Sequence, residues 1–194
     1  MSRIASVVQW ERWMDERAKV ARVPRVWLIG EANPYQSGPR PEFDLYPHPP
    51  QSAGARLCRI LGYEQEEYLA TFERRNLLYG TKWSAPAARD AATQLRRQEV
   101  GSGDALVLCG ARVAAAFGIV FEPLARLRRL AGPTGAHVCI CLVIPHPSGL
   151  SRAWNDPTMA PRVREAVRAL LPGAPVPGDR KSGRRRRYPE GAGS

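Results

Sequence analysis

The sequence predicts an α/β domain of three layers, with helices on both faces of a central, mostly parallel, four-stranded sheet. Residues 138–144 are seven consecutive apolar residues, four of them β-branched, which is typical of a strand buried on both faces of a parallel sheet. Short apolar runs alternate with helical segments along the chain, as in doubly wound folds. Loops that contain Gly or Pro follow two of these runs, at residues 30–35 and 145–152. Such loops lie at the carboxyl ends of strands, where open α/β sheets bind their ligands.

Capping residues and helix breakers predict where the elements begin and end. Ser52 is a suitable N-cap for a helix through Leu61, and Gly62 can end that helix. Residues 36–50 are Pro-rich and too long for a simple connection, which is typical of a segment that lines a site. The other expected elements are helices at 6–20, 65–72, 86–99, 111–117 and 157–171 and strands at 26–29, 76–79 and 104–109.

The composition indicates one globular domain. A chain of 194 residues that is 44% apolar is long enough to bury a core, so we expect a single domain over residues 1–172. Residues 173–194 are rich in Pro, Gly and Arg and are expected to form a basic, disordered tail. We find neither an apolar run long enough to span a membrane nor a secretory pattern, and therefore expect a monomeric cytoplasmic protein without membrane contact. The four cysteines form no C-x-x-C pair and are expected to be core residues, so neither a metal nor an iron–sulfur cluster is expected.

The net charge of +11 points to a polyanionic partner such as DNA. Two simpler explanations compete with this interpretation. Only three residues are lysines, so the basicity is almost entirely arginine, as a GC-rich genome would produce. Part of the charge also lies in the tail, at residues 180–187. Charge alone therefore suggests nucleic acid without establishing it.

Three short sequences at predicted strands or strand ends carry a resemblance to a known family. His146-Pro147-Ser148-Gly149-Leu150-Ser151 follows the buried strand, Gly30-Glu31-Ala32-Asn33-Pro34-Tyr35 follows the first strand, and Arg75-Asn76-Leu77-Leu78 overlaps the second. They resemble the H-P-S-x-L-S motif, the G-x-D/N-P-Y/G or G-E-A-P-G motif and the T-N-V-V motif of the uracil-DNA glycosylase superfamily. The resemblance covers about residues 25–171. It implies the three-layer fold of that family and an enzyme that flips a damaged or modified base out of DNA and hydrolyses its N-glycosidic bond.

In the late loop, the resemblance implies that His146 donates a hydrogen bond to the departing base anion. Leu150 would be the wedge that fills the gap left by the flipped nucleotide. The structural alternatives are a histidine satisfied by backbone groups and a leucine that anchors the loop in the core. Further DNA contacts are expected from the backbone of Pro147, Ser148 and Gly149 and from the side chain of Arg152.

The early loop is one residue longer than either family form, so the group that positions water stays open. Aligned from the glycine, Glu31 takes the place of the carboxylate, which could act as a base. Aligned from the Pro-Tyr end, Asn33 takes the place of the water-positioning residue, and we favour this alignment. Tyr35 would then guard the floor of the base pocket, with ordinary packing as its alternative role.

The base itself would be read by Asn76, which presents both a donor and an acceptor. The alternative is an asparagine that caps the end of a strand. A stacking aromatic residue is expected from residues 36–50, where Tyr46 and Phe43 are the candidates.

The scarcity of lysine favours a monofunctional enzyme, and we expect no cofactor. Bifunctional glycosylases attack through an amine, and Lys82 is the only lysine expected near the site. The substrate would be uracil or, because the early loop and residues 36–50 depart from the family, a hypermodified pyrimidine such as a glucosylated base of phage DNA. The role would be DNA repair in the first case and antiviral defence in the second.

Two other functions remain open. A non-catalytic nucleic-acid-binding module on the same fold would share the basic charge. An enzyme acting on small molecules at the same edge of the sheet would leave Leu150 and the arginines without a role.

Overall fold

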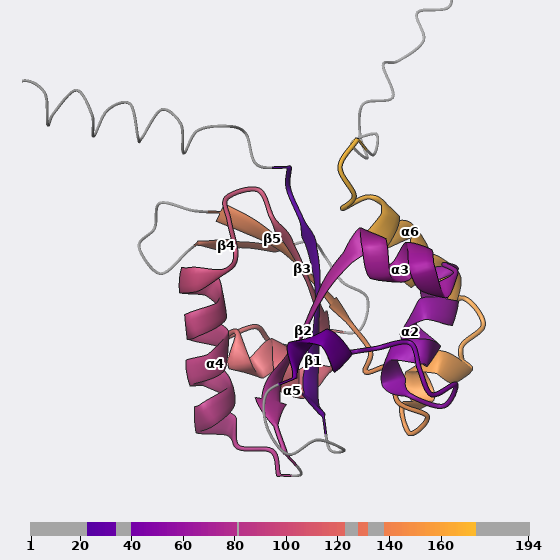
Figure 1. Ribbon diagram of the computed structural model, residues 1–194, viewed down its shortest axis with the longest axis horizontal. Coiled ribbons are helices and arrows are strands. Elements are labelled where there is room, and N and C mark those ends of the chain that lie inside the picture. The colour runs from indigo at the N-terminus through magenta and orange to yellow at the C-terminus, as the bar shows by residue number, and fades with distance from the viewer. Residues whose placement is uncertain (1–22, 34–39, 81, 123–127, 132–137, 174–194) are drawn as a thin grey trace, which may run out of the picture.

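The computed structural model describes residues 23–33, 40–80, 82–122, 128–131 and 138–173 (Figure 1). The expected α/β fold with four parallel strands is confirmed, and helices flank the sheet. The strand order is β2-β1-β3-β5-β4. The strands are β1 (Val26–Asn33), β2 (Phe72–Tyr79), β3 (Ala105–Cys109), β4 (Arg128–Ala131) and β5 (Val138–Ile144), and the helices are η1 (Pro41–Phe43), α2 (Ala53–Leu61), α3 (Gln65–Thr71), α4 (Ala85–Gln98), α5 (Ala111–Ala116), η2 (Arg152–Asn155) and α6 (Met159–Arg168).

The sheet has one strand more than the sequence predicts. β4 pairs antiparallel with β5, with Arg128 opposite Cys141 and Ala131 opposite Val138, and forms the edge of the sheet. Its sequence, Arg-Arg-Leu-Ala, lacks the apolar pattern of the central strands. An edge strand needs only one hydrogen-bonded neighbour, which explains why such a sequence can be accommodated there.

The interpretation of residues 30–33 as a loop is wrong, because they continue β1. Beyond Ile29 the strand pairs only with β2, where Gly30 lies opposite Asn76 and Asn33 opposite Tyr79. Its pairing with β3 ends at Ile29, opposite Leu108. β1 therefore separates from β3 at Gly30. This is the point where the chain, having placed β2 on one side of β1, places β3 on the other, the topological switch point of an open sheet.

Helices on both faces enclose the sheet in two hydrophobic cores (Figure 1). On one face, α2, α3 and α6 pack against strand residues such as Leu28, Val107 and Leu142. On the other, α4 and α5 pack against Trp27, Leu106 and other alternate residues. The period of two along β1 and β3 thus supplies both cores, and the continuous apolar runs are explained. No helix of the described residues is long and apolar enough to cross a membrane.

The predicted caps of α2 are confirmed. The Ser52 side chain accepts a hydrogen bond from the Ala55 N–H, and Gly62 ends the helix in the left-handed conformation with φ 76°. Ser84 caps α4 in the same way, by accepting from the Ala87 N–H. The expected helices at 65–72, 111–117 and 157–171 also form, with shifted ends.

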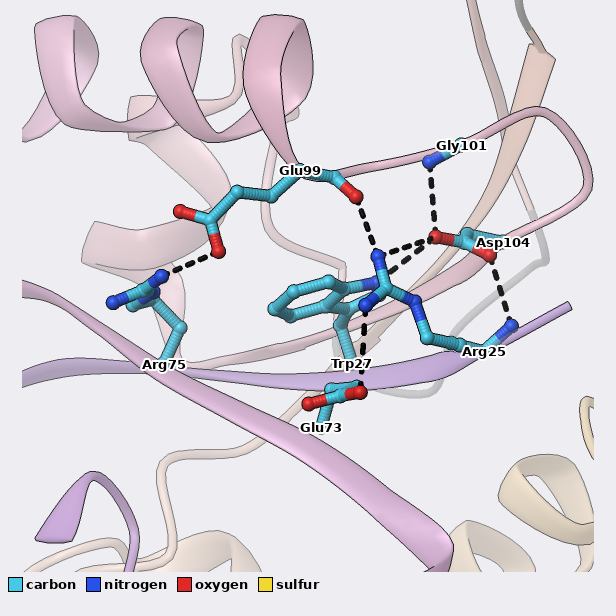
Figure 2. A network of polar contacts seen from close by, with 7 residues as sticks. All are labelled: Arg25, Trp27, Glu73, Arg75, Glu99, Gly101 and Asp104. Atoms are coloured by element: carbon cyan, nitrogen blue, oxygen red, sulfur yellow. Dashed lines mark hydrogen bonds and ion pairs between the residues drawn. The ribbon is translucent and has the colours of Figure 1, made fainter. Parts of the chain in front are cut away.

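The buried carboxylate of Asp104, just before the start of β3, fixes the register of β1 against β3. Asp104, 1% exposed, accepts hydrogen bonds from the Arg25 N–H (2.9 Å), the Trp27 Nε1–H (3.1 Å) and the Gly101 N–H (2.9 Å). The Arg25 guanidinium lies 3.6 Å from the Asp104 carboxylate and 4.4 Å from the centre of the Trp27 ring. Figure 2 shows these groups converging on Asp104, with Arg25 and Trp27 at the start of β1 and Gly101 in the turn before β3.

Asp104→Ala is expected to lower the free energy of unfolding by about 3 kcal/mol, because it leaves three donors without an acceptor. Urea denaturation measures this loss. Asp90→Ala, on the exposed surface of α4, is the matched control and should change stability by less than about 0.5 kcal/mol. Equal losses in the two variants would contradict the assigned role of Asp104.

Candidate active site

The candidate site lies at the carboxyl ends of β1, β3 and β5, where β1 has separated from β3. Glu31 comes from β1, Gly110 follows β3 and His146 follows β5. The Gly110 N–H donates to the Ile144 carbonyl at 2.8 Å, which holds the ends of β3 and β5 together beyond the last paired residues. The structure thus brings Glu31 and His146 to one place although they are far apart in the sequence.

His146 is partly buried, and its hydrogen bonds define its tautomer. Nδ1 accepts a hydrogen bond from the Ser148 N–H at 3.2 Å, so Nδ1 carries no proton and the neutral ring bears its proton on Nε2. The His146 carbonyl accepts from the Trp154 Nε1–H at 2.7 Å. Within the described residues, Nε2 has no hydrogen-bond partner. The backbone therefore fixes the ring and leaves the Nε2–H as a donor.

The environment of the ring favours its neutral form. Burial lowers the pKa of the His146 imidazole below its usual value of 6.5, and the nearby Arg112 guanidinium lowers it further. The Glu31 carboxylate acts in the opposite direction and raises this pKa. A neutral imidazole donates its Nε2–H without carrying a full positive charge.

Gly110 allows His146 and Glu31 to approach the same point of the backbone. A Cβ at this position would lie 3.1 Å from His146 Cβ, 3.3 Å from His146 Cδ2 and 3.5 Å from Glu31 Oε1. Its φ of 104° is also a conformation that side chains rarely adopt. Glycine is thus required here by both its backbone angle and its neighbours.

Glu31 forms an ion pair with Arg112 on α5. The Arg112 Nη1 lies 3.4 Å from Glu31 Oε2, and the side chains are 63% and 22% exposed respectively. Glu31 therefore directs one carboxylate oxygen to Arg112 and has the other near Gly110. Asn33, the rival for the water-positioning role, is the last residue of β1, but its side chain lies outside the described part of the chain, as does Tyr35.

The loop after His146 presents an apolar tip on a braced backbone. Leu150 is 93% exposed, so the alternative of a leucine anchored in the core is wrong. The Ser148 carbonyl accepts from Arg56 Nη1 at 2.9 Å and from the Ser151 N–H at 3.3 Å. Pro147 is buried below the tip, whereas Gly149 and Arg152 are exposed.

Asn76 is held by a carboxylate that the sequence did not predict. Asp44 is 0% exposed, and it accepts hydrogen bonds from Asn76 Nδ2 (3.2 Å) and from the Tyr79 hydroxyl (3.0 Å). Because a carboxylate only accepts, the amide nitrogen of Asn76 faces Asp44, and Asn76 Oδ1 lies beside Gly30, where a Cβ would come within 2.2 Å of it. Burial raises the pKa of Asp44, and its donors oppose this rise. Asp44 thereby attaches the segment between β1 and α2 to β2.

The candidate stacking residues lie on the same segment. Phe43, in η1, is 39% exposed, and Tyr46 is half-buried. Their rings meet edge to face with centroids 5.8 Å apart, and the Arg74 guanidinium lies 5.9 Å from the Tyr46 ring centre. Of the two side chains, that of Phe43 is the more exposed and therefore the more available for stacking.

Three contributions were missed by the sequence reasoning: Asp44, Arg112 and Arg56. Each of these residues contacts a partner that is distant in the sequence, so no local sequence pattern predicts its role. Asp44 offered one signal, since it is an acidic residue between the aromatic residues Phe43 and Tyr46 in a segment predicted to line a site.

No group of three His, Cys, Asp or Glu side chains in the described ranges is arranged to hold a metal ion. Cys58, Cys109, Cys139 and Cys141 are buried free thiols.

A scan of the sequence against known protein-family models finds no matching family, and a search of the curated proteins gives no significant match.

Gly110→Ala is expected to displace the His146 ring, and Gly118→Ala is its matched control. Both glycines have positive φ, but a Cβ at Gly118 would meet nothing within 4 Å. Each variant should lose about 1 kcal/mol of stability through backbone strain. Only Gly110→Ala should also shift the ring signals of His146 in NMR spectra, and unchanged signals would contradict the close approach.

Proposed function

We propose that this protein is a monofunctional DNA glycosylase of the uracil-DNA glycosylase superfamily, with that family's three-layer fold. The observation that carries the proposal is the hydrogen bond from the Ser148 N–H to His146 Nδ1, which leaves the ring proton on Nε2 at the carboxyl end of β5. A donor of this kind suits a reaction in which negative charge develops on a departing base. The exposed Leu150 beside it supports a DNA substrate over a small molecule.

In the proposed reaction, the N-glycosidic bond breaks and its electron pair leaves with the base. The His146 Nε2–H donates a hydrogen bond to a carbonyl oxygen of the base and stabilises the anion. Water adds to the sugar carbon, and its proton passes to a carboxylate or to solvent. Glu31 can accept that proton, whereas Asn33 can only orient the water. The proximity of Glu31 to Gly110 and His146 supports Glu31 more than the sequence alone did.

DNA would be held on the face that carries the tip of the loop. Leu150 would enter the stack, and the exposed backbone at Gly149 would contact the phosphates, since glycine allows close approach. Of the other expected backbone contacts, Pro147 is buried and the Ser148 N–H already donates to His146. Arg152 would add a phosphate contact. Asn76, oriented by Asp44, would read the edge of the flipped base, and Phe43 or Tyr46 would stack on it. Lys82 is exposed in the segment before α4, and we assign it no covalent role.

The substrate is uracil or a hypermodified pyrimidine such as a glucosylated base of phage DNA. Release of free base from uracil-containing DNA and from modified phage DNA, measured in parallel, separates these cases. Release of uracil alone would end the antiviral version, and release from phage DNA alone would end the repair version. Release from neither would contradict the proposed function and favour the non-catalytic binding module.

His146→Ala should slow base release at least about 100-fold in single-turnover assays, because it removes the donor to the base anion. DNA affinity, measured by fluorescence anisotropy, should change little. His48→Ala, which alters an exposed histidine before α2, should retain the wild-type rate. A His146→Ala variant as fast as wild type would refute the role of His146.

Leu150→Ala should leave the free energy of unfolding within about 0.5 kcal/mol of wild type, because the side chain is 93% exposed. Base release from duplex DNA should fall about tenfold, since the wedge no longer stabilises the flipped state. Release from single-stranded DNA should fall less. Val120→Ala, which shortens a side chain that is 72% exposed, controls for a general loss of apolar surface. If Leu150→Ala slowed release from duplex and single-stranded DNA equally, the wedge role of Leu150 would be excluded.

A further inference from the structure

We propose that Arg112 is a positioning residue that, through its ion pair with Glu31, keeps the His146 ring as a neutral donor with its proton on Nε2. This inference deepens the proposed function and rests on it for its catalytic meaning. Its structural content, the protonation of His146, can be measured without any substrate.

The Glu31 carboxylate works against the neutral form of His146. Glu31 Oε1 and the His146 ring lie against the same point of Gly110, so a carboxylate charge is near the imidazole. An unopposed carboxylate stabilises a cationic imidazole. If the ring took up a second proton, Nδ1 could no longer accept the Ser148 N–H. The loop that carries Leu150 would then lose one of its contacts.

Arg112 opposes this effect of Glu31 in two ways. Its guanidinium lies 3.4 Å from Glu31 Oε2, so it compensates the carboxylate charge directly. The same positive charge also disfavours a cationic imidazole, and both Arg112 and burial lower the pKa of His146 while Glu31 raises it. Glu31 from β1 and Arg112 from α5 are the charged groups that act on His146 among the described residues, with Arg56 of α2 contacting the same loop at the Ser148 carbonyl.

A contribution to stability does not by itself explain the ion pair between Arg112 and Glu31. The Arg112 side chain is 63% exposed, and pairs of this kind add little to the free energy of unfolding. Its effect on a neighbouring titratable group is different, because the ring is partly buried and screened less. Arg112 is therefore better explained by its action on Glu31 and His146 than by its contribution to the fold.

The test is an NMR titration of the His146 ring in the full-length protein and its variants. Arg112→Gln should raise the proton affinity of His146 about three- to tenfold, because Glu31 is then unopposed. Glu31→Gln should lower it, and the double variant should lie close to wild type. Arg112→Lys keeps the charge and should restore the wild-type titration. Arg162→Gln, an exposed arginine on α6, is the matched control and should have no effect.

An unchanged or lower proton affinity in Arg112→Gln would overturn the inference. Because Arg112 is exposed, this variant is expected to fold; if it does not, a Glu31→Gln variant that fails to lower the proton affinity overturns the inference instead. Where base release is found, the acid limb of its rate profile should move to higher pH in Arg112→Gln. Loss of the proposed function would appear as absent base release in wild type with the expected titration shifts intact, so the two failures are distinguishable.

Discussion

The candidate site depends on the point at which β1 stops pairing with one of its two neighbouring strands. β1 pairs with β2 along its whole length, but with β3 only as far as Ile29. Beyond that point the sheet opens, and side chains from β1 and from the loops after β3 and β5 can occupy the same place. Gly110 sets how close they come, because hydrogen replaces a side chain exactly where His146 and Glu31 approach it. At the other end, Asp104 keeps β1 and β3 together.

The net charge of +11 favours the neutral form of His146, because surrounding positive charge disfavours a second proton on the ring. In the proposed function, the phosphates of bound DNA would act in the opposite direction and favour a cationic imidazole. Burial and Arg112 give His146 a low pKa before DNA arrives, and the Ser148 N–H occupies Nδ1. Together these effects allow the His146 ring to keep a single proton when the phosphates of DNA come near.

The sequence was sufficient for features that have a local cause. The apolar runs of β1, β3 and β5 predicted the parallel sheet, and Ser52 and Gly62 predicted the ends of α2. The loop after β5 was correctly expected at the carboxyl end of a central strand. β4 and the first half of β2 were missed because they carry charged residues where a strand pattern expects apolar ones. β2 tolerates them at the edge of the sheet, where Glu73 pairs with Arg25 and Arg75 with Glu99.

The sequence supplied the site candidates themselves, such as His146, Glu31, Asn76 and Leu150, but not the side chains that hold them. Asp44 meets Asn76, and Arg112 meets Glu31, across separations that no spacing rule covers. The extension of β1 was also hidden, because Gly30-Glu31-Ala32-Asn33 shows no alternation and pairs on one side only.

The order in which the site residues occur along the chain has a consequence for synthesis. Glu31 is made early, Gly110 and Arg112 follow the middle of the chain, and His146 comes only after the last central strand. Every contiguous fragment that contains both Glu31 and His146, the groups that meet at Gly110, spans at least residues 31–146. A ribosome must therefore release most of the chain before the site can assemble, and products of termination before His146 lack one of the two groups that meet at Gly110.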